Sequence, residues 1–380
     1  MTSASYSSAA AEPFEGLRIR GVAKTFGTDT TVLNEIDLDV HPGELISLVG
    51  SSGTGKSTLL RIIAGLEEPS AGRVTYAGQP LERGSVGVVF QRPILYPHLS
   101  VKDNILFPTR LGAFAGRVDM DYYRELLEAL KLEGLESRKP SQLSGGQAQR
   151  VGIARALIRR APVVLFDEPL ASVDEQMSAS IRADIVRLHE RYGFTGLYVT
   201  HDQNEALMLG QRVAVMDAGY LVQVDTPERL LAHPHTLQVA KLLAAPALNL
   251  LALEDSESLP AGCELAIRAT ALCPVTADTA HALPVQVLGS RHLVGGMLYR
   301  ARLLEAVSLP LESRRASAES ELSARVRAGQ ELEFFISDAQ GGILSGTSPN
   351  STFLSAGERV HLGVAAERCF LFSCGKRFYL

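Results

Sequence analysis

The fold of this chain is decided by one stretch, Leu45-Ile46-Ser47-Leu48-Val49-Gly50-Ser51-Ser52-Gly53-Thr54-Gly55-Lys56-Ser57-Thr58, in which an apolar run leads into a glycine-rich loop. A helical pattern follows at 59–64, and a loop of this type between a strand and a helix is typical of a site for nucleotide phosphates. Glycines let backbone N–H groups surround a phosphate, Lys56 neutralises the β and γ oxygens, and the Ser57 hydroxyl is a Mg²⁺ ligand. We therefore predict an α/β fold that binds ATP and Mg²⁺ at residues 50–58. The alternative, a simple glycine turn, does not explain the flanking strand and helix.

Two carboxylates, Asp167 and Glu168, follow a second apolar run at 163–166. The carboxyl ends of parallel strands are where α/β sheets bind ligands. Asp167 is predicted to hold Mg²⁺ through its water shell, and Glu168 to orient or deprotonate the water that attacks the γ-phosphate. Without the glycine-rich loop, a solvated strand end would be the better interpretation. A third apolar run, 196–200, brings His201 to the same edge, where its imidazole is placed to contact the γ-phosphate.

The bulk composition excludes several classes of protein. The chain has 380 residues, of which 46% are hydrophobic and 21% charged, so it is long enough for two globular domains. A net charge of −5 gives no basic excess, and we expect no nucleic-acid partner. No apolar run approaches the roughly 20 residues that cross a bilayer. The Ser/Ala-rich residues 1–13 are predicted to be a disordered tail rather than an export signal.

The apolar patterns divide the chain into segments. Residues 14–240 alternate apolar runs with helical patterns, as in an α/β domain, but 17–22 and 36–40 alternate apolar with polar residues, as antiparallel strands do. A helical subdomain is predicted at about 92–160. Residues 241–380 contain short strand patterns between turns, which favours a small all-β barrel or sandwich. Cysteines occur at Cys263, Cys273, Cys369 and Cys374 without zinc-ligand spacing, so we expect thiols and no metal there.

Residues 142–150, Gln-Leu-Ser-Gly-Gly-Gln-Ala-Gln-Arg, resemble the signature motif of the ABC ATPase family. Their place between the glycine-rich loop and the Asp167 strand is also that of the family. Ser144, Gly145, Gly146 and Gln147 form a second phosphate-binding turn at the start of a helix. A second phosphate site in a chain with one P-loop implies that ATP is shared between two chains in a head-to-tail homodimer.

The resemblance implies further site residues. Phe26 is similar to the aromatic residue that stacks on adenine. Gln91 matches the glutamine that approaches Mg²⁺ and the attacking water, and the apolar residues after it, within about 91–100, are expected where two membrane permease subunits dock. Asp174 matches the aspartate of the D-loop, but Ala171-Ser172-Val173 departs from the usual Ser-Ala-Leu or Ser-Asn-Leu, which leaves open how the two sites communicate.

The C-terminal segment indicates an importer. Residues 245–251, 265–268 and 367–372 resemble landmarks of the oligonucleotide-barrel-like (TOBE-like) regulatory domain of binding-protein-dependent importers. Residues 181–189, 198–203 and 223–227 look most like the carbohydrate and glycerol-phosphate group. A sugar or glycerol phosphate is therefore the predicted cargo, delivered by a solute-binding protein, and importers of polyamine, iron or sulfate remain alternatives.

Two rival functions were weighed against the importer. A non-transport ABC ATPase acting on DNA or the ribosome would require basic surfaces and a coiled-coil insertion or a second cassette, for which residues 91–144 are too short. A module that binds nucleotide without hydrolysis is disfavoured by the presence of Lys56, Asp167, Glu168 and His201. The resulting prediction is an ATPase at the cytoplasmic face of the membrane.

Overall fold

The structure is a computed structural model that describes residues 14–110, 118–254, 259, 262–310, 323–337, 354–364, 368–373 and 375–377. The chain forms two compact units, Met1–Pro227 and Glu228–Leu380. The tail predicted at 1–13 lies outside the described residues. None of the helices in the described ranges combines the length and the apolar character needed to cross a bilayer.

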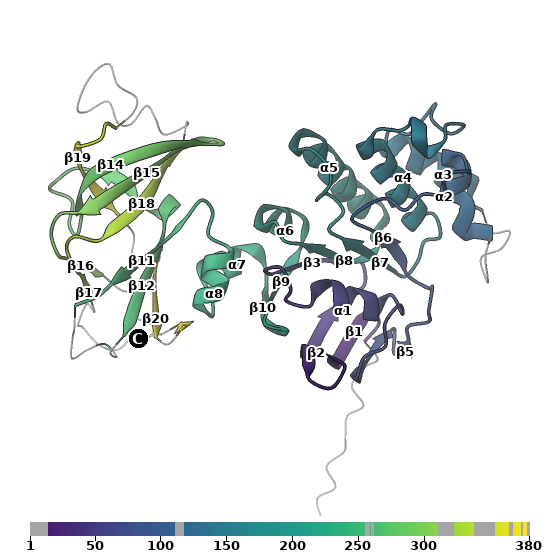
Figure 1. Cartoon of the computed structure of the whole chain (residues 1–380), viewed down its shortest axis with the longest axis horizontal. Coiled ribbons are helices and arrows are strands. Elements are labelled where there is room, and N and C mark those ends of the chain that lie inside the picture. The colour runs from purple at the N-terminus through teal and green to yellow at the C-terminus, as the bar shows by residue number, and fades with distance from the viewer. Residues whose placement is uncertain are drawn as a thin grey trace, which may run out of the picture. The chain divides into compact units, whose positions relative to one another are not determined.

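A six-stranded sheet forms the centre of the first unit (Figure 1). Five strands are parallel and β10 is antiparallel to β9, and the order across the sheet is β10-β9-β3-β8-β7-β6. The predicted apolar runs account for this arrangement, because strands covered on both faces need apolar side chains in both directions. The strands are β3 (Leu45–Val49), β6 (Gly87–Val89), β7 (Val163–Asp167), β8 (Thr195–Thr200), β9 (Arg212–Asp217) and β10 (Tyr220–Asp225).

An antiparallel sheet covers one side of this unit, as the alternating pattern near the N-terminus predicts. Its order is β2-β1-β4-β5, from β1 (Leu17–Phe26), β2 (Thr30–Val40), β4 (Ala71–Tyr76) and β5 (Gln79–Pro80). Helix α1 (Lys56–Ile63) shares one buried cluster with both sheets, through Leu59, Leu60 and Ile63. The P-loop is therefore fixed between two sheets.

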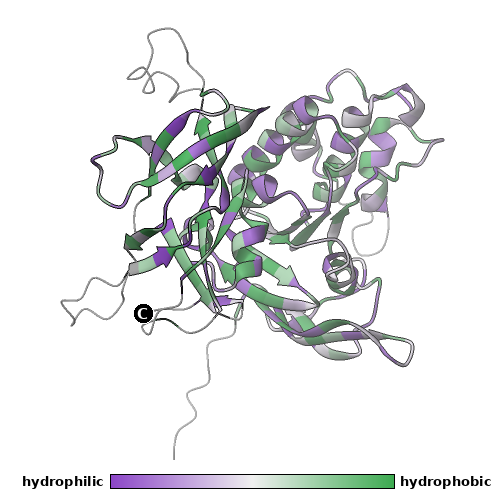
Figure 2. Cartoon of the chain, turned by 60° about the vertical axis from the view of Figure 1, so that its left-hand side comes forward, coloured by the Kyte–Doolittle hydropathy of each residue, from purple (hydrophilic) through white to green (hydrophobic). Residues whose placement is uncertain are grey.

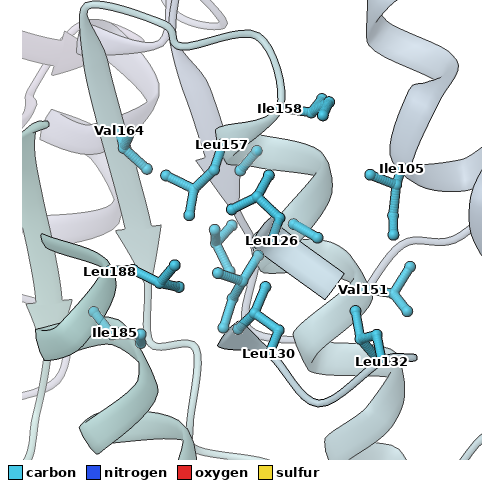
Figure 3. Close-up of a cluster of buried hydrophobic side chains, with 14 of the residues drawn as sticks. Ile105, Leu126, Leu130, Leu132, Val151, Leu157, Ile158, Val164, Ile185 and Leu188 are labelled. Carbon is cyan, nitrogen blue, oxygen red and sulfur yellow. The ribbon is translucent and has the colours of Figure 1, made fainter. Parts of the chain in front are cut away.

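The predicted helical subdomain lies on the other face of the parallel sheet. It comprises α2 (Val101–Leu106), the short 3₁₀ helix Phe107–Arg110, α3 (Met120–Ala129), the 3₁₀ helix Pro140–Gln142 and α4 (Gly145–Leu157). Helix α5 (Glu175–Tyr192) joins them in one apolar cluster, part of which is drawn in Figure 3. Helix α6 (Gln203–Leu209) follows β8. In Figure 2 the central strands are mostly hydrophobic, whereas the helices alternate between hydrophilic and hydrophobic residues.

The second unit begins earlier than the sequence indicates. The sequence predicts a boundary at 240/241, but helix α7 (Pro227–Ala232) precedes that point, helix α8 (Leu237–Leu242) spans it, and the compact units divide after Pro227. The reason is burial: Leu237 and Ala240 of α8 pack against Ala266, Phe370 and Phe372 of the C-terminal strands.

The remainder of the second unit consists of strands, as predicted. One sheet has the order β11-β12-β20-β21 and another β13-β19-β14-β15-β18, with β16 and β17 forming a separate pair. Asn249 of β11 connects the two larger sheets, because its side chain bonds the backbone of Ile267 in β12 and of Glu333 in β18. Cys263 and Cys369 are buried and Cys273 is exposed, while Cys374 lies outside the described ranges. The strands are β11 (Leu248–Ala252), β12 (Cys263–Arg268), β13 (Cys273–Val275), β14 (Leu283–Leu293), β15 (Gly296–Leu303), β16 (Val307–Pro310), β17 (Ser323–Val326), β18 (Glu331–Ser337), β19 (Arg359–Gly363), β20 (Cys369–Ser373) and β21 (Lys376–Arg377), and Ala269–Ala271 form a 3₁₀ helix.

Candidate nucleotide site

The glycine-rich loop joins β3 to α1 in a conformation that requires glycine. Gly53 has φ 82° and Gly55 has φ 97°, both in the left-handed region. A Cβ on Gly55 would lie 2.6 Å from the Leu33 side chain, so the loop also packs too closely for any larger residue. Ser51, Ser52 and Gly53 are exposed, while Ser57 and Thr58 are partly buried at the start of α1. The exposed rim therefore offers backbone N–H groups at a helix N-terminus, as a phosphate site needs.

Lys56 lies inside this loop. Its Nζ donates to the carbonyl oxygens of Gly50, at 2.8 Å, and Ser51, at 2.9 Å, and the residue is only 5% exposed. Burial lowers the pKa of Lys56, and the nearby charges of Glu168 and Asp167 oppose that shift. The Lys56 ammonium is therefore hydrogen-bonded to two neutral carbonyl oxygens, and a negatively charged phosphate can replace them as its partner.

Ser57 and Asp167 come together although they are far apart in the sequence. The Ser57 hydroxyl donates to Oδ1 of Asp167 at 3.3 Å. Burial raises the pKa of Asp167; the Ser57 hydrogen bond opposes this and the charge of Glu168 adds to it. A hydroxyl and a carboxylate side by side are hard oxygen ligands, the type that Mg²⁺ prefers, so the donors present fit this ion.

Glu168 and His201 form the second pair at the same sheet edge. Nδ1 of His201 lies 3.0 Å from Oε2 of Glu168, and the Glu168 side chain is 22% exposed. Glu168 has φ 44°, an unfavourable value for a residue with a side chain, and its N–H donates to the Val199 carbonyl at 3.0 Å. Such backbone conformations persist where the surrounding structure enforces them, commonly at active sites.

A buried network fixes the turn that carries His201. The Glu205 carboxylate accepts hydrogen bonds from the hydroxyls of Thr200, at 2.8 Å, and Tyr198, at 3.1 Å. The Asp202 side chain then caps α6 by accepting from the N–H groups of Asn204 and Glu205. The sequence analysis did not identify Glu205; the signal available was an acidic residue on an apolar helix face.

The signature residues begin α4 on the opposite face of the parallel sheet from α1 (Figure 1). Ser144 Oγ accepts from the Gln147 N–H at 3.3 Å, and Gln147 Oε1 accepts from the Ser144 N–H at 3.0 Å, which is a capping box. A Cβ on Gly145 would meet nothing within 4 Å, whereas one on Gly146 would lie 2.6 Å from Met177. Within the described ranges, no hydrogen bond or ion pair joins residues 144–147 to residues 50–58. One chain therefore does not bring its two predicted phosphate sites together.

The structure gives the remaining predicted residues no hydrogen bond to Lys56 within the described ranges. Phe26, at the end of β1, is 42% exposed, with Lys24 Nζ 4.9 Å from the centre of its ring. Gln91 is exposed just after β6. Asp174 caps α5 by accepting from the Met177 N–H at 3.0 Å.

A buried ion pair joins the signature helix to the helix that Asp174 caps. Nε and Nη2 of Arg150 in α4 lie 3.1 and 2.9 Å from Oδ2 of Asp184 in α5, and Asp184 is fully buried. Arg150 also donates to the Ser180 hydroxyl at 2.8 Å. Because a buried carboxylate is costly without its partner, this pair fixes the orientation of α4 on α5.

Three side chains that the sequence analysis missed hold the loop at 91–100, called here the docking loop. Gln149 of α4 donates to the Phe90 carbonyl at 3.2 Å, and Nη1 of Arg155 donates to the Ile94 carbonyl at 2.6 Å. Asn104 of α2, fully buried, exchanges hydrogen bonds with the backbone of Tyr96. The backbone on both sides of Gln91 is thus bonded to the signature helix.

We expect Arg155→Met to loosen the docking loop. A hydrogen bond to a charged group contributes about 1.5–3 kcal/mol, so exchange of the Leu95 and Tyr96 amides with deuterium should accelerate by at least about 10-fold. Arg155→Lys, which keeps a cation, should restore part of the protection. The matched control is Arg110→Met, which removes a neighbouring exposed ion pair with Asp103. Equal exchange in Arg155→Met and wild type would show that Arg155 does not hold the loop.

Known proteins resemble this chain both in sequence and in fold. The family model described as "ABC transporter" matches residues 33–171. The sn-glycerol-3-phosphate import ATP-binding protein UgpC 1 of Rhizobium johnstonii is 45% identical over 241 residues, which are 62% of this chain and 65% of the relative. The protein UgpC of Salmonella typhi, with the same import description, is 42% identical over 266 residues, 67% of this chain and 74% of the relative. Among solved structures, cbiO1 of Clostridium perfringens, part of the ABC transporter complex cbiONQ, aligns with a TM-score of 0.52 and 27% identity over 58% of this chain and 92% of that chain.

Proposed function

Since the chain belongs to the ABC transporter family of import ATP-binding proteins, we propose that it hydrolyses ATP as a homodimer to drive uptake of a sugar or glycerol phosphate through separate membrane permeases. The observation that carries this proposal is the sheet edge at which Lys56, Ser57, Asp167, Glu168 and His201 meet. A module that bound nucleotide without hydrolysing it would not need a carboxylate held beside a histidine at that edge.

Glu168 is the proposed general base. An ionised carboxylate only accepts hydrogen bonds, so Nδ1 of His201 is the donor in the 3.0 Å contact. This bond orients the carboxylate, whose other oxygen is left to take the proton of the attacking water. With Nδ1 carrying a proton, Nε2 of His201 can donate to a phosphate oxygen only in the imidazolium form.

Ser57 is the proposed Mg²⁺ ligand and Asp167 is proposed to hold the ion through its water shell, with Gln91 approaching from the docking loop. The ion, when bound with ATP, supplies positive charge at the β and γ oxygens. Because burial raises the pKa of Asp167, the proton competes with the metal over a wider range than for an exposed aspartate. Mg²⁺ affinity should therefore decrease as the pH falls through that raised pKa.

ATP is proposed to lie between two chains. The signature residues of one chain start a capped helix whose N-terminus is open at Gly145, and they are separated from the P-loop of the same chain by the sheet. A head-to-tail partner would bring its own Ser144, Gly145, Gly146 and Gln147 to the phosphates held at Lys56. Phe26 is the proposed adenine contact and Asp174 the residue facing the partner.

The docking loop is the proposed contact with the permeases. Ile94 is 63% exposed and Tyr96 39% exposed, whereas Leu95 packs against the buried cluster of the helical subdomain. Apolar side chains held outward on a hydrogen-bonded loop favour a protein contact. The chain would then act at the cytoplasmic face of the membrane, and a solute-binding protein would contact only the permeases.

We expect reconstitution to identify the cargo. The chain should be co-purified with two candidate permease subunits from the same organism and placed in lipid vesicles with a candidate solute-binding protein. ATP turnover should rise several-fold when that protein is loaded with sn-glycerol 3-phosphate or a sugar. Stimulation by a polyamine, iron or sulfate instead would contradict the proposed cargo while leaving the ATPase assignment intact.

A further inference from the structure

A cavity lies at the end of the parallel sheet opposite the nucleotide site. It measures about 310 Å³ and lies entirely within the first unit. Its walls are mainly aromatic or apolar, and Leu157 and Val164, both labelled in Figure 3, connect it to the buried cluster. The aromatic residues of the wall are Tyr76, Tyr122, Tyr192 and Phe194. A cavity of this size and composition is within the range of small-molecule sites in proteins.

This cavity touches the far ends of the elements that carry the nucleotide-site motifs. Gly43 precedes β3, which leads to the P-loop, and Pro162 precedes β7, which ends at Asp167. Thr195 begins β8, which leads to His201. Leu157 ends α4, the helix that starts after Ser144. A molecule that filled this cavity would therefore contact residues in, or a short distance before, all four elements.

Most polar groups of the wall already have partners. The Tyr122 hydroxyl donates to the Leu157 carbonyl at 3.3 Å, and burial raises the pKa of Tyr122 to about 12, so it stays neutral. The Tyr192 hydroxyl donates to Glu125 at 2.7 Å, and the Thr195 hydroxyl accepts from the Gly43 N–H at 3.0 Å. The hydroxyl protons of Tyr122 and Tyr192 are therefore not available to a ligand.

Arg160 and Tyr76 are the exceptions in the wall. The Arg160 guanidinium lies over the Tyr122 ring, 4.3 Å from its centre, and bonds Asp119 through Nη2 at 3.0 Å, but within the described ranges Nε and Nη1 donate to no acceptor. The Tyr76 hydroxyl also hydrogen-bonds no described residue. Arg160 has φ 47°, a value at which glycine would be less strained. Its side chain is therefore present despite an unfavourable backbone conformation. The Arg160 side chain is 62% exposed, so the cavity combines aromatic and apolar walls with a solvent-accessible guanidinium, a group that pairs with carboxylates.

We propose that this cavity binds a small aromatic carboxylate, with the ring among Tyr76, Tyr122 and Phe194 and the carboxylate on Arg160, and that its occupancy alters ATP turnover. The ring would be held by stacking and edge contacts of the kind aromatic pairs make. The link to turnover follows from the four elements that end at the cavity, because a ligand that binds one arrangement of them more tightly shifts the population toward it.

Binding of 2-naphthoate to the full chain, measured by isothermal titration calorimetry, tests the site. Because the Arg160 side chain is largely exposed, loss of its ion pair with the carboxylate should raise the Kd by about 3–5-fold in Arg160→Gln, and a smaller increase is expected in Tyr76→Phe. The matched control is Arg124→Gln on α3, which removes an exposed pair with Asp121 outside the cavity and should leave the Kd unchanged. The uncharged analogue 2-naphthalenemethanol should bind more weakly, and its Kd should not respond to Arg160→Gln.

The outcomes separate binding from regulation and from the ATPase assignment. Absence of 2-naphthoate binding at millimolar concentration, or an equal Kd in wild type and Arg160→Gln, would overturn the site whatever the ATPase activity. Turnover of wild type should change with a midpoint near its Kd for 2-naphthoate, and in Arg160→Gln this midpoint should move to higher concentration by the same factor as the Kd. Unaltered turnover of wild type with 2-naphthoate bound would overturn the regulatory role.

Discussion

Glu168→Gln should lower steady-state ATP turnover by about 10²–10⁴ while leaving ATP affinity close to that of wild type. Glutamine has nearly the shape of glutamate and can still accept the hydrogen bond from Nδ1 of His201 through its carbonyl oxygen. It cannot take a proton from water at neutral pH. The substitution therefore removes the proposed base and keeps the phosphate site at residues 50–58.

Two measurements make this result interpretable. ATP binding and ATP turnover should be measured on the same preparation, because a loss of both would indicate damage to the P-loop rather than loss of a base. The matched control is Glu175→Gln, which removes a carboxylate at the start of α5 whose side chain is 91% exposed. Turnover of Glu168→Gln within a factor of two of Glu175→Gln would exclude Glu168 as the base.

ATP-dependent dimerisation should be lost when Gly145→Asp is added to Glu168→Gln. The Glu168→Gln protein retains bound ATP, so sedimentation should show a monomer without nucleotide and a dimer with Mg-ATP. An aspartate at 145 would face the γ-phosphate of the partner's ATP, and like charges brought together at an interface cost several kcal/mol. We therefore expect the double variant to dimerise at least about 100-fold more weakly and to remain monomeric at micromolar concentration.

The structure selects position 145 for this test. A side chain on Gly146 would require the Met177 side chain to move, whereas a Cβ on Gly145 meets nothing within 4 Å. A carboxylate in the first turn is also favourable for α4, so the helix should not be weakened. Gly145→Ala is the control, which adds a methyl group without charge and should still dimerise. Dimerisation of the aspartate variant equal to that of Gly145→Ala would refute a nucleotide shared between chains.

The residues of the nucleotide site could be predicted because each belongs to a contiguous pattern. A loop at 50–58 between a strand and a helix, and two carboxylates at the end of another apolar strand, have a local conformation that short sequences specify. The geometry between these patterns could not be predicted in the same way. That Asp167 bonds Ser57, and that Glu168 bonds His201, depends on the order β3-β8-β7 in the sheet.

The misplaced domain boundary has a related cause. Helices α7 and α8 follow the α/β pattern without a break in composition. Only the contacts in the folded chain show that α8 packs on Phe370 and Phe372. The same is true of Gln149 and Arg155, which on the sequence are ordinary polar residues of a helix. Their hydrogen bonds to Phe90 and Ile94 join segments that are distant in the chain.

The sequence by itself identified the residues that we propose bind phosphate, hold a metal ion and accept a proton, because glycine conformation, charge and strand-end placement are local properties. Only the tertiary structure decided which of these groups meet: Lys56, Asp167 and Glu168 share one sheet edge, while Ser144 and Gly145 lie across the sheet from that P-loop. It also decided the cavity beside Arg160, whose walls come from segments between Pro42 and Thr195. The physical reason is that the packing of apolar faces from distant segments sets the distances between these side chains. A sequence pattern indicates that a face is buried, but it does not indicate which other segment covers that face.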